Sequence, residues 1–461
     1  MTKSTTLYDS VKSESQSIQK MASTLTEARR PLVTASVETH TMGRSLYRYL
    51  EIKVHQAVRK RAYDKITVVG SYNRDCHSEP FHGEKTDKEF NWQRPTALVV
   101  NGNELLIQCF PGYDYVEHYA QLIATYLKLQ QEQDGETLRL THPSKVTFIP
   151  ISVLGAQRAL HATNLKQLPP TVDTVVLGVV HHFTRLLGDV KWRGGDECFG
   201  WTVRKFNDRL VAFVGCRPSF WGDLSGEVVH YLASFLPLKE VLYVGKLGTV
   251  KRGIRPNTYL ATGERSYLHE RLVEWENPLE KVATALAPDR VVVGDHVTVG
   301  SVMHETKDWL KSLPDSIYLV DNEIGTMAHA AVRSRIKFGY LHIISDNLSQ
   351  KYQEDLSNER DESVLGRRIY LYGLIQDILE SYLTVGAKIK PQPQPQPQPE
   401  GEWRIKLDGR QKHEEWALNE KEDWTLNKKH DWRTDTADKW HNMNGRKWQR
   451  SGHQAILCSE D

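Results

Sequence analysis

Two acidic clusters in the last third of the chain stand where carboxyl groups could do acid–base chemistry. Asp321 and Glu323 follow an apolar run at residues 316–320, and Ser345 and Asp346 follow a second apolar run. Both runs have the composition of buried strands, and in open α/β sheets ligands bind at the carboxyl ends of the strands. Two carboxyl side chains delivered to that edge could donate and accept protons there.

Taken singly, these signals have simpler structural explanations. A Ser-Asp pair at a strand end more often caps a helix than donates a proton, and Asp321 and Glu323 alone would usually be solvated turn charges. His181 and the histidine after it would point to opposite faces of a strand, and no Cys/His set accompanies them. His304 and Glu305 open an HExxH-like string that lacks its second histidine. We therefore predict no metal site.

Three further segments combine glycine with polar residues. They read GVVHHFTR at 178–185, VGKLGTV at 244–250 and GDHVTVGS at 294–301. A glycine-rich turn lets backbone amides approach an anion closely, although one such turn alone is weak evidence. The order of the three segments and the two acidic clusters is more specific than any one of them.

In that order, the segments resemble the purine nucleoside phosphorylase and nucleosidase superfamily, and residues 171–383 carry the resemblance. The sequence V-D-N-E at 320–323 is similar to the family's V-E-M-E motif, and the strand ending in Ser345 and Asp346 is similar to its Ser-Asp strand. The motifs are closest to those of the methylthioadenosine/S-adenosylhomocysteine nucleosidases, whose helical histidine is matched by His329. We interpret the chain as a divergent relative.

The resemblance implies roles for several residues in cleaving a purine N-glycosidic bond. Asp346 would protonate the leaving base at N7 if burial raises its pKa, and Glu323 would anchor the ribose hydroxyls beside the developing positive charge. The base pocket would include the family's GDxFxxGS segment, whose stacking phenylalanine is replaced here by Val297. The resemblance also assigns three residues to substrate binding: Thr298, Asn322 and Ser345.

The nucleophile is the part of the site where the chain departs from the family. The glutamate that activates water in the nucleosidases is replaced by His181, whose imidazole would be the alternative base. The phosphate-binding G-D-x-x-R pattern is absent, and the remaining candidates for holding phosphate are Lys246, Thr249 and Arg185. Phosphorolysis and hydrolysis both stay open, with phosphate as a possible co-substrate and no other cofactor.

The order of elements predicts an α/β fold. Residues 169–388 alternate short β-branched runs with helical segments, which is typical of a sheet covered by helices. We expect a three-layer nucleoside-phosphorylase-like domain with a mixed central sheet and flanking helices. Its seven predicted strands lie at residues 174–180, 210–215, 240–245, 257–262, 290–293, 316–320 and 340–345, and a small-residue helix is expected at 325–338.

The remaining regions differ in composition. Residues 43–168 show a mixed α/β pattern without a motif, with strands predicted at 65–69, 97–110 and 146–151 and helices up to residue 60 and at 116–131. Residues 1–42 are polar and predicted to be disordered. Residues 389–400 form a Pro-Gln linker, and residues 401–461 form a low-complexity tail, also expected to be disordered, in which tryptophan recurs every eighth residue.

Composition limits the function classes. The chain has 461 residues, with 60 Lys and Arg against 58 Asp and Glu. The net charge of +2 is too small to predict binding to nucleic acid or to a membrane. Five cysteines without CxxC spacing argue against a disulfide framework, and no signal-peptide pattern opens the chain, so a cytoplasmic location is expected. The expected partners are a small-molecule nucleoside, further copies of the chain in a homo-oligomer, and a protein bound by the tryptophan repeats.

Two functions remain open. The first is an active nucleoside phosphorylase or nucleosidase, which the pairing of Glu323 with Asp346 favours. The second is a catalytically inactive protein of the same fold that binds a ligand or acts as a scaffold. The lysine at position 246, the valine at position 297 and the missing phosphate motif favour the second.

Overall fold

A large mixed sheet forms the centre of the computed structural model, which describes residues 32–134, 140–149, 151–219, 222–269, 271–354, 356–359 and 361–384. Its strands follow the order β11-β10-β13-β14-β8-β15-β9-β12, and β5 joins β8 to the β7–β6 hairpin. Parallel and antiparallel pairs both occur, as in the parallel β5–β8 and antiparallel β6–β7 pairs. The strands of this sheet are β5 (Thr174–Gly178), β6 (Phe199–Phe206), β7 (Arg209–Cys216), β8 (Glu240–Thr249), β9 (Leu260–Thr262), β10 (Arg265–Leu268), β11 (Arg271–Glu274), β12 (Val291–Val293), β13 (Asp295–Thr298), β14 (Ile317–Asp321) and β15 (Lys337–Asn347).

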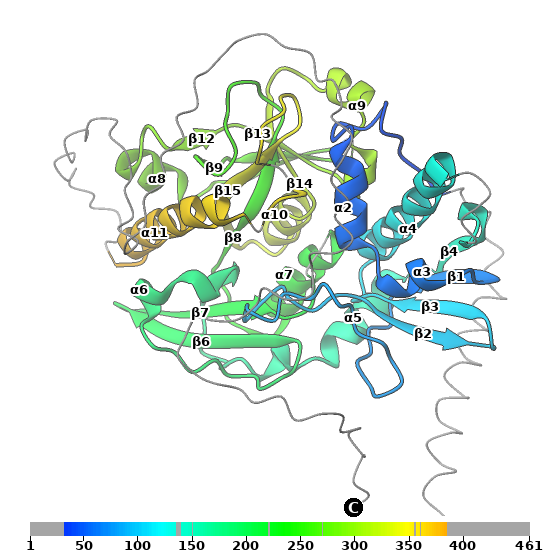
Figure 1. Cartoon of the computed structure of the whole chain (residues 1–461). Coiled ribbons are helices and arrows are strands. Elements are labelled where there is room, and N and C mark those ends of the chain that lie inside the picture. The colour runs from blue at the N-terminus through cyan, green and yellow to red at the C-terminus, as the bar shows by residue number, and fades with distance from the viewer. Residues whose placement is uncertain are drawn as a thin grey trace, which may run out of the picture. The chain divides into compact units, whose positions relative to one another are not determined.

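Helices cover both faces of this sheet because its central strands are apolar on both sides. In β5, Val175 and Leu177 pack into the core that contains α7 (Asp223–Phe235) and α10 (Ile324–Arg333), whereas Val176 packs into the opposite core. That second core contains α6 (Thr184–Leu187), α8 (Glu280–Leu286) and α11 (Glu362–Thr384). The arrangement is visible in Figure 1 and confirms the predicted mixed α/β fold with flanking helices.

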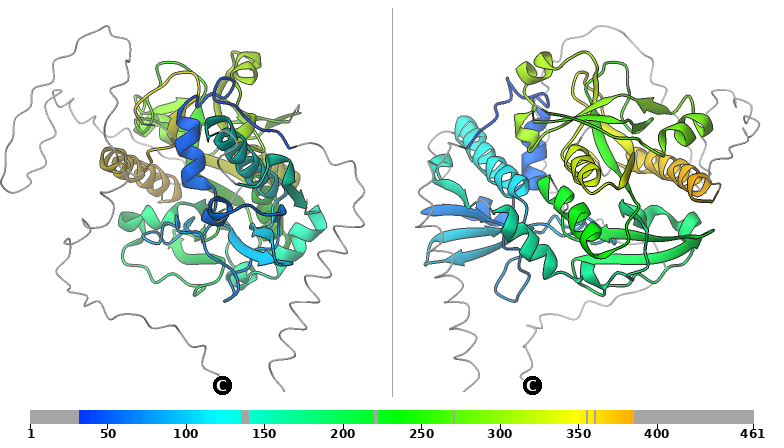
Figure 2. Two further views of the ribbon diagram at one scale, coloured as in Figure 1. Left: turned by 45° about the vertical axis from the view of Figure 1, so that its right-hand side comes forward. Right: turned by 180° about the vertical axis from the view of Figure 1, so that it is seen from behind.

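A smaller mixed sheet is built from the first part of the chain. Its order is β2-β3-β1-β4, in which β1 runs parallel to both neighbours and β2 forms an antiparallel hairpin with β3. Helix α4 packs against this sheet on one side and against α2 and α7 on others, and α2 and α4 lie side by side in both views of Figure 2. These elements are α2 (Ser45–Lys53), α3 (Gln56–Lys60), β1 (Lys65–Val69), β2 (Thr96–Val100), β3 (Glu104–Gln108), α4 (Tyr113–Asp134), β4 (Val146–Ile149) and α5 (Val153–His161).

Short helical turns and one further helix complete the described elements. The 3₁₀ turns are η2 (Pro143–Lys145), η3 (Asn164–Gln167), η4 (Val180–His182) and η5 (Val302–His304), and the helix is α9 (Lys307–Ser312). No helix among the described residues is long and apolar enough to cross a membrane.

The two sequence regions share one hydrophobic core. Leu50 of α2, Leu122 of α4 and Leu165 of η3 belong to the same buried cluster as Val175 and Leu319 of the large sheet. The predicted boundary at 168/169 therefore does not separate two cores, and the described residues form one compact unit.

The structure differs from the predicted N-terminal disorder at residues 32–42. His40 is fully buried, its Nε2 lies 2.9 Å from the carbonyl oxygen of Val302, and its backbone bridges Thr306. Ala35 also joins the main core. The few apolar and aromatic side chains of this segment are enough to order it, because they pack against elements from later in the chain. The predictions for residues 1–31, the Pro-Gln linker and the tryptophan tail lie outside the described residues.

Candidate active site

A cavity of about 250 Å³ opens where the carboxyl ends of the large-sheet strands face the first part of the chain. Its first wall comes from β5, β8, β14 and β15 and the residues directly after them. Its second wall comes from α2, α4 and the connection that precedes β2. Residues of the first wall include Gly178, His181, Lys246, Gly248, Asn322, Glu323, Ser345 and Asp346, and those of the second include Tyr49, Lys53, Lys85, Lys88, Arg94, Tyr115 and His118.

Close approaches between backbone segments shape the first wall. Gly178 has φ of +115°, and a Cβ there would lie 1.9 Å from the carbonyl oxygen of Val244, so only glycine lets β5 and β8 meet at this point. A Cβ at Gly248 would lie 2.9 Å from Oδ2 of Asp346. The glycines of the predicted phosphate-binding turn therefore make room for strands and for a carboxyl group. The turn itself is not formed, because β8 continues to Thr249 and stays paired with β15 beyond a register shift between Ile344 and Asp346.

Asp346 is half-buried at the end of β15, and its carboxyl group has one strong local partner. Ser345 Oγ lies 2.8 Å from its Oδ1 and donates to it, and the same hydroxyl lies 3.2 Å from the carbonyl oxygen of Leu247. Burial raises the pKa of Asp346 to about 6, the hydrogen bond from Ser345 opposes this, and the Glu359 charge adds to it. Such a carboxyl group holds a proton at mildly acidic pH and can deliver it near neutrality.

Asp321 and Glu323 have separate tasks although only one residue lies between them. Asp321 Oδ1 accepts hydrogen bonds of 3.0 Å from the amides of Glu323 and Ile324, so it stabilises the start of α10. Glu323 is directed into the cavity, where the Tyr243 hydroxyl hydrogen-bonds to it. Burial, reinforced by the Asp321 charge, raises the pKa of Glu323 well above its usual value. Asn322 also lines the cavity while its amide donates to the carbonyl oxygen of Val299 at 2.5 Å.

His181 lines the cavity as the resemblance predicts, but its environment does not suit a base. Neither ring nitrogen has a hydrogen-bond partner among the described residues, and the ring packs edge-on against Phe90 with centroids 5.7 Å apart. Burial lowers the pKa of His181 to about 2, and the charges of His182 and Lys88 lower it further. The imidazole is therefore neutral and a weak proton acceptor.

Lys246 lines the cavity as well, but it is engaged by a carboxylate. Its Nζ forms an ion pair with Glu359, whose other oxygen lies 3.3 Å from Nζ of Lys85. Nη1 of Arg368 lies 3.5 Å from the same carboxylate. Despite burial, these cations hold the pKa of Glu359 well below its usual value. Three cations thus converge on one carboxylate.

Four predicted site residues do not line the cavity. Val297 packs in a small apolar cluster with Ile317 and Val320, and the Thr298 hydroxyl lies 2.8 Å from the amide of Gly325, from which it accepts a hydrogen bond. The Thr249 hydroxyl donates to the carbonyl oxygen of Tyr318 at 2.9 Å, because β8 turns this side chain toward β14. Arg185 pairs with Asp377 on the surface of α11, since α6 packs against that helix.

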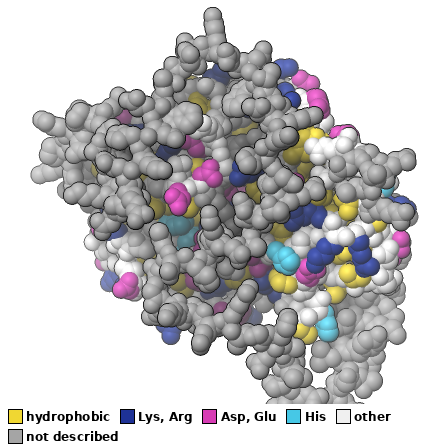
Figure 3. Space-filling model, in the orientation of Figure 1, with side chains coloured by type: hydrophobic (Ala, Val, Ile, Leu, Met, Phe, Trp, Pro, Cys, Tyr) yellow, Lys and Arg dark blue, Asp and Glu magenta, His cyan; other side chains and the backbone are white. Residues whose placement is uncertain are grey.

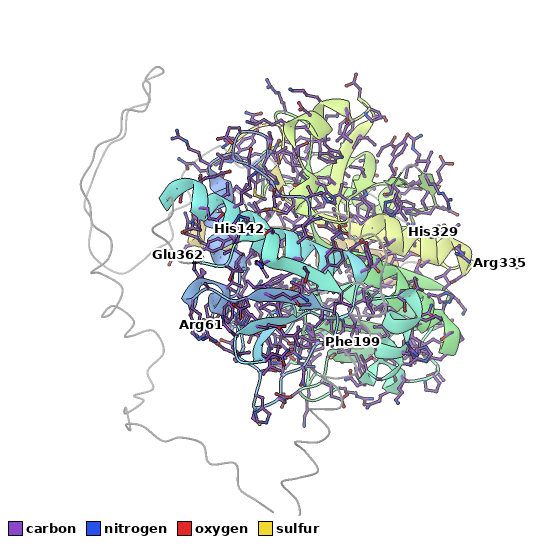
Figure 4. The ribbon with its side chains drawn as sticks, turned by 90° about the vertical axis from the view of Figure 1, so that its right-hand side faces the viewer. Arg61, His142, Phe199, His329, Arg335 and Glu362 are labelled. Carbon is purple, nitrogen blue, oxygen red and sulfur yellow. The ribbon has the colours of Figure 1, made fainter. Side chains whose placement is uncertain are left out.

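His329, which also matches the family, is half-exposed on α10 and is not among the lining residues. Figure 4 places it at the periphery near Arg335. Its position agrees with a structural role and not with a part in the chemistry.

The most important lining residues that the sequence did not indicate lie on the second wall and at Glu305. Glu305 is only 6% exposed, and burial together with the Asp346 charge raises its pKa well above the usual value. In the sequence, Glu305 was noted only as part of an HExxH-like string and not as a residue of the cavity. The lysines and tyrosines of residues 43–168 belong to no motif, so only the tertiary structure brings them to the site.

No protein-family model matches the chain. Among curated proteins the chain is similar to the oxidoreductase cns1 of Cordyceps militaris, with 27% identity over 178 residues. The match covers 35% of this chain and 21% of that protein, so the chain spans about a fifth of the curated relative it matches.

The solved structures that the fold matches include methylthioadenosine/S-adenosylhomocysteine nucleosidases. The Campylobacter jejuni enzyme shares 12% identity, with 46% of this chain and 99% of that chain covered and a TM-score of 0.37. A putative methylthioadenosine nucleosidase of Weissella paramesenteroides shares 14% identity over 47% of this chain and 99% of that chain, with a TM-score of 0.38. The S-adenosylhomocysteine nucleosidase of Streptococcus pyogenes shares 13% identity over 48% of this chain and 100% of that chain, with a TM-score of 0.36.

Proposed function

We propose that this protein cleaves the N-glycosidic bond of a purine nucleoside, with Asp346 as general acid and Glu323 as the ligand of the ribose hydroxyls. The observation that carries the proposal is that both carboxyl groups line one cavity and burial raises the pKa of each. A carboxyl group with a pKa near 6 can protonate a leaving base close to neutral pH.

The proposed reaction is hydrolytic. The bond between the anomeric carbon and the base nitrogen breaks, its electron pair goes to the base, and Asp346 places its proton on that base. A water oxygen bonds to the anomeric carbon and loses a proton. In this scheme Glu323 accepts hydrogen bonds from the ribose hydroxyls, and these bonds strengthen as positive charge develops on the sugar.

We assign the acceptor of the water proton to Glu305 and not to His181. Glu305 lines the cavity, and a carboxylate with a raised pKa is a stronger base than an imidazole with a pKa of about 2. In single-turnover assays we expect Glu305→Gln to lower the rate of base release by at least about a hundredfold and His181→Ala by less than about tenfold. The reverse ranking would return the role of base to His181.

The proposal is tested by incubating the full-length protein with adenosine, inosine, guanosine, uridine and methylthioadenosine and measuring free base by chromatography. We expect base release from at least one purine substrate and a loss of at least about a hundredfold in Asp346→Asn. Asp308→Asn is the matched control, because Asp308 is exposed and pairs only with Lys311 among the described residues. The absence of base from every substrate would exclude the proposed activity.

The ion pair of Lys246 with Glu359 disfavours phosphorolysis, because the carboxylate occupies the cation that would hold co-substrate phosphate. The alternative to hydrolysis is a ligand-binding protein without turnover, and the weak basicity of His181, at the position of the nucleosidases' glutamate, favours it. Tight nucleoside binding by calorimetry without base release would support this alternative. A homo-oligomer, expected from the resemblance, remains a proposal that light scattering of the purified protein would test.

A further inference from the structure

The second wall of the cavity carries four basic side chains from the first part of the chain. Lys53 ends α2, and Lys85, Lys88 and Arg94 lie in the connection between β1 and β2. They face the wall that holds Asp346 and Glu323. The site proposed above uses none of them.

These basic groups are crowded together without equal acidic charge. Burial lowers the pKa of Lys53 to about 7 and that of Lys88 to about 8, and the neighbouring cations lower both further, so a bound anion would favour their charged forms. Glu359 is paired with Lys246, Lys85 and Arg368, so its single negative charge is already shared by three cations. Within the described part of the chain, Lys53, Lys88 and Arg94 have no acidic partner within 4 Å. Of the other lining acids, Asp346 carries a proton when it acts as the acid, and burial raises the pKa of Glu323. Asp321 is engaged by the amides of Glu323 and Ile324 and lies 3.0 Å from Nε2 of His296, so Glu305, the base of the proposed reaction, is the remaining carboxylate among the described lining acids.

Arg368 provides a second, independent observation. Its side chain is 6% exposed, Nε donates to Oδ1 of Asn257 at 2.7 Å, and Nη2 is buried without a partner among the described residues. A buried guanidinium N–H without an acceptor is costly, on the order of 1–3 kcal/mol. A ligand oxygen in the cavity would remove that cost, since Arg368 belongs to the lining.

The basic connection is held in place before any ligand binds. Phe90 sits against the glycine pair Gly200 and Gly215 of β6 and β7, where added Cβ atoms would lie 2.7 and 2.1 Å from its ring. The amide of Asn91 donates to the carbonyl oxygen of Cys216 at 2.7 Å. Arg94 is steadied in turn, because its Nη1 donates to the carbonyl oxygen of Asn91 at 3.1 Å. Preorganised donors bind an anion without the entropy cost of ordering them.

We propose that Lys53, Lys88, Arg94 and Arg368 bind a phosphate dianion carried by the substrate, so that the substrate is a purine nucleoside monophosphate. This inference rests on the proposed function for the purine half of the ligand. A phosphate monoester carries a charge of about −1.5 to −2 at neutral pH and three acceptor oxygens, which suits several convergent N–H donors.

The same chemistry could come from free inorganic phosphate, but the residues that would hold a co-substrate are engaged elsewhere. Thr249 bonds to Tyr318, Arg185 lies on the surface, and Lys246 is paired with Glu359. The cations without acidic partners stand instead on the second wall. A phosphate attached to the sugar would reach that wall while the base stays with Asp346.

The first experiment measures binding apart from turnover. Calorimetry with the full-length Asp346→Asn variant compares adenosine, adenosine 5′-monophosphate and inorganic phosphate. We expect the monophosphate to bind at least about a hundredfold more tightly than adenosine, as expected for two charge-assisted hydrogen bonds. Equal affinities would overturn the inference, whatever the outcome of the assays for base release.

The second experiment identifies the residues. Lys88→Ala and Arg94→Ala should each weaken monophosphate binding about tenfold or more and leave adenosine binding unchanged. Lys311→Ala is the control for removing a lysine, because Lys311 is 77% exposed and pairs only with Asp308 among the described residues. Thermal melts verify that each variant is folded. Losses of the same size for adenosine and its monophosphate would show a structural effect and count against the proposal.

Turnover separates the two sources of phosphate. With the wild-type protein we expect adenosine monophosphate to release adenine with a kcat/KM at least about a hundredfold above that of adenosine, without added phosphate. Stimulation of adenosine cleavage by inorganic phosphate, with the monophosphate left uncut, would overturn the substrate-borne source. If the monophosphate binds tightly and no substrate is cleaved, the anion site stands and the proposed activity fails.

Discussion

At the scale of single residues, environment divides the labour among three nearby carboxyl groups. Asp321 accepts backbone amides and caps α10, Glu323 meets the Tyr243 hydroxyl, and Asp346 accepts one side-chain hydrogen bond from Ser345. Burial raises the pKa of Asp346 to about 6 and that of Glu323 well above its usual value. Carboxyl groups therefore acquire different tasks from their burial and from the hydrogen-bond donors around them.

The pKa of Asp346 predicts the pH dependence of the reaction. Because a general acid must be protonated, kcat/KM should fall about tenfold per pH unit above pH 6. Lys246 lowers that pKa, so Lys246→Met should move the falling limb to higher pH. A pH series from 5 to 9 with both proteins checks this, with Lys311→Met as the variant that should not shift. A limb that stays in place in Lys246→Met would contradict the assignment of Asp346.

Most of the predicted site residues that follow strands reach the cavity, and their roles stay predictions. Six of them line the cavity, because a short motif at the end of a strand also indicates where in the sheet its residues lie. They are Asp346, Glu323, Asn322, Ser345, His181 and Lys246. Thr249 and Arg185 do not line the cavity, because the direction of a side chain at a strand end or on a four-residue helix depends on packing with distant elements. The pairing of Lys246 with Glu359 joins residues 113 positions apart, which no local pattern reveals.

At the scale of elements, apolar strands were predicted and strands rich in polar residues were missed. The prediction for residues 65–69 coincides with β1, and the helix at 116–131 lies within α4. The strand at 97–110 proved to be the β2–β3 hairpin, turned at Asn101 and Gly102 with positive φ. The eight-residue strand β6 and the four-residue strands β10, β11 and β13 were missed, because polar and charged residues interrupt their apolar pattern. The three-residue strands β9 and β12 fall within predicted strands. The helix predicted at 325–338 ends at Arg333, since Arg335 has φ of +57° and the chain then enters β15.

The Phe90 contact predicts an unusual sensitivity at a small residue. Gly215→Ala would place a Cβ 2.1 Å from the Phe90 ring, so we expect a loss of about 1–3 kcal/mol in the free energy of unfolding. Urea denaturation checks this. Gly366→Ala, at an exposed position of α11 with nothing within 4 Å of the added Cβ, should be neutral or slightly stabilising. A double variant that also carries Phe90→Ala should lose less than the sum of the two single changes.

Reciprocal caps between α4 and α7 predict a pH effect on stability. The amide of Asp223 donates to Asp114 at 2.9 Å, and the amide of Asp114 donates to Asp223 at 3.0 Å. Burial and the Asp223 charge raise the pKa of Asp114 to about 7, so its stabilising contribution is present below pH 4 and is lost as pH rises toward and through 7. Asp114→Asn keeps an acceptor without the charge.

Relative to wild type, we expect Asp114→Asn to gain about 1 kcal/mol or more in unfolding free energy at pH 8 compared with pH 5. Urea denaturation at the two pH values measures the difference. Asp308→Asn, on the exposed surface, should show no such trend. A gain at pH 5 that disappears at pH 8 would have the wrong sign and refute the explanation.

At the scale of the whole molecule, one hydrophobic core contains side chains from both regions that the sequence composition separates, residues 43–168 and 169–388. Acidic and basic side chains are interspersed where Figure 3 shows described residues, in keeping with the net charge of +2. The basic groups proposed to bind the ligand are gathered inside the cavity, and the net charge of the chain does not reveal such a local cluster. Composition could therefore suggest a small-molecule partner but not the charge of that partner.

Removal of residues 1–168 should unfold the remainder. Leu50, Val58, Leu122 and Leu127 are each 2% exposed or less and belong to the core that also holds Val175. Exposing the surface they cover removes about 1.5–3 kcal/mol per large side chain, against a total stability of about 5–15 kcal/mol. Circular dichroism and size-exclusion chromatography of residues 169–388 check this. A monodisperse fragment with a cooperative melt would show that the second part folds alone.

The connection that bears Lys88 and Phe90 is secured by β7, more than a hundred residues later in the chain. Contacts between such distant segments close large loops, and their entropy cost delays them during folding. We therefore expect the cavity to be among the last features to form during folding. A folding intermediate with helices and both sheets but without these long-range contacts would lack the cavity. Ligand binding would therefore report that the tertiary structure is complete.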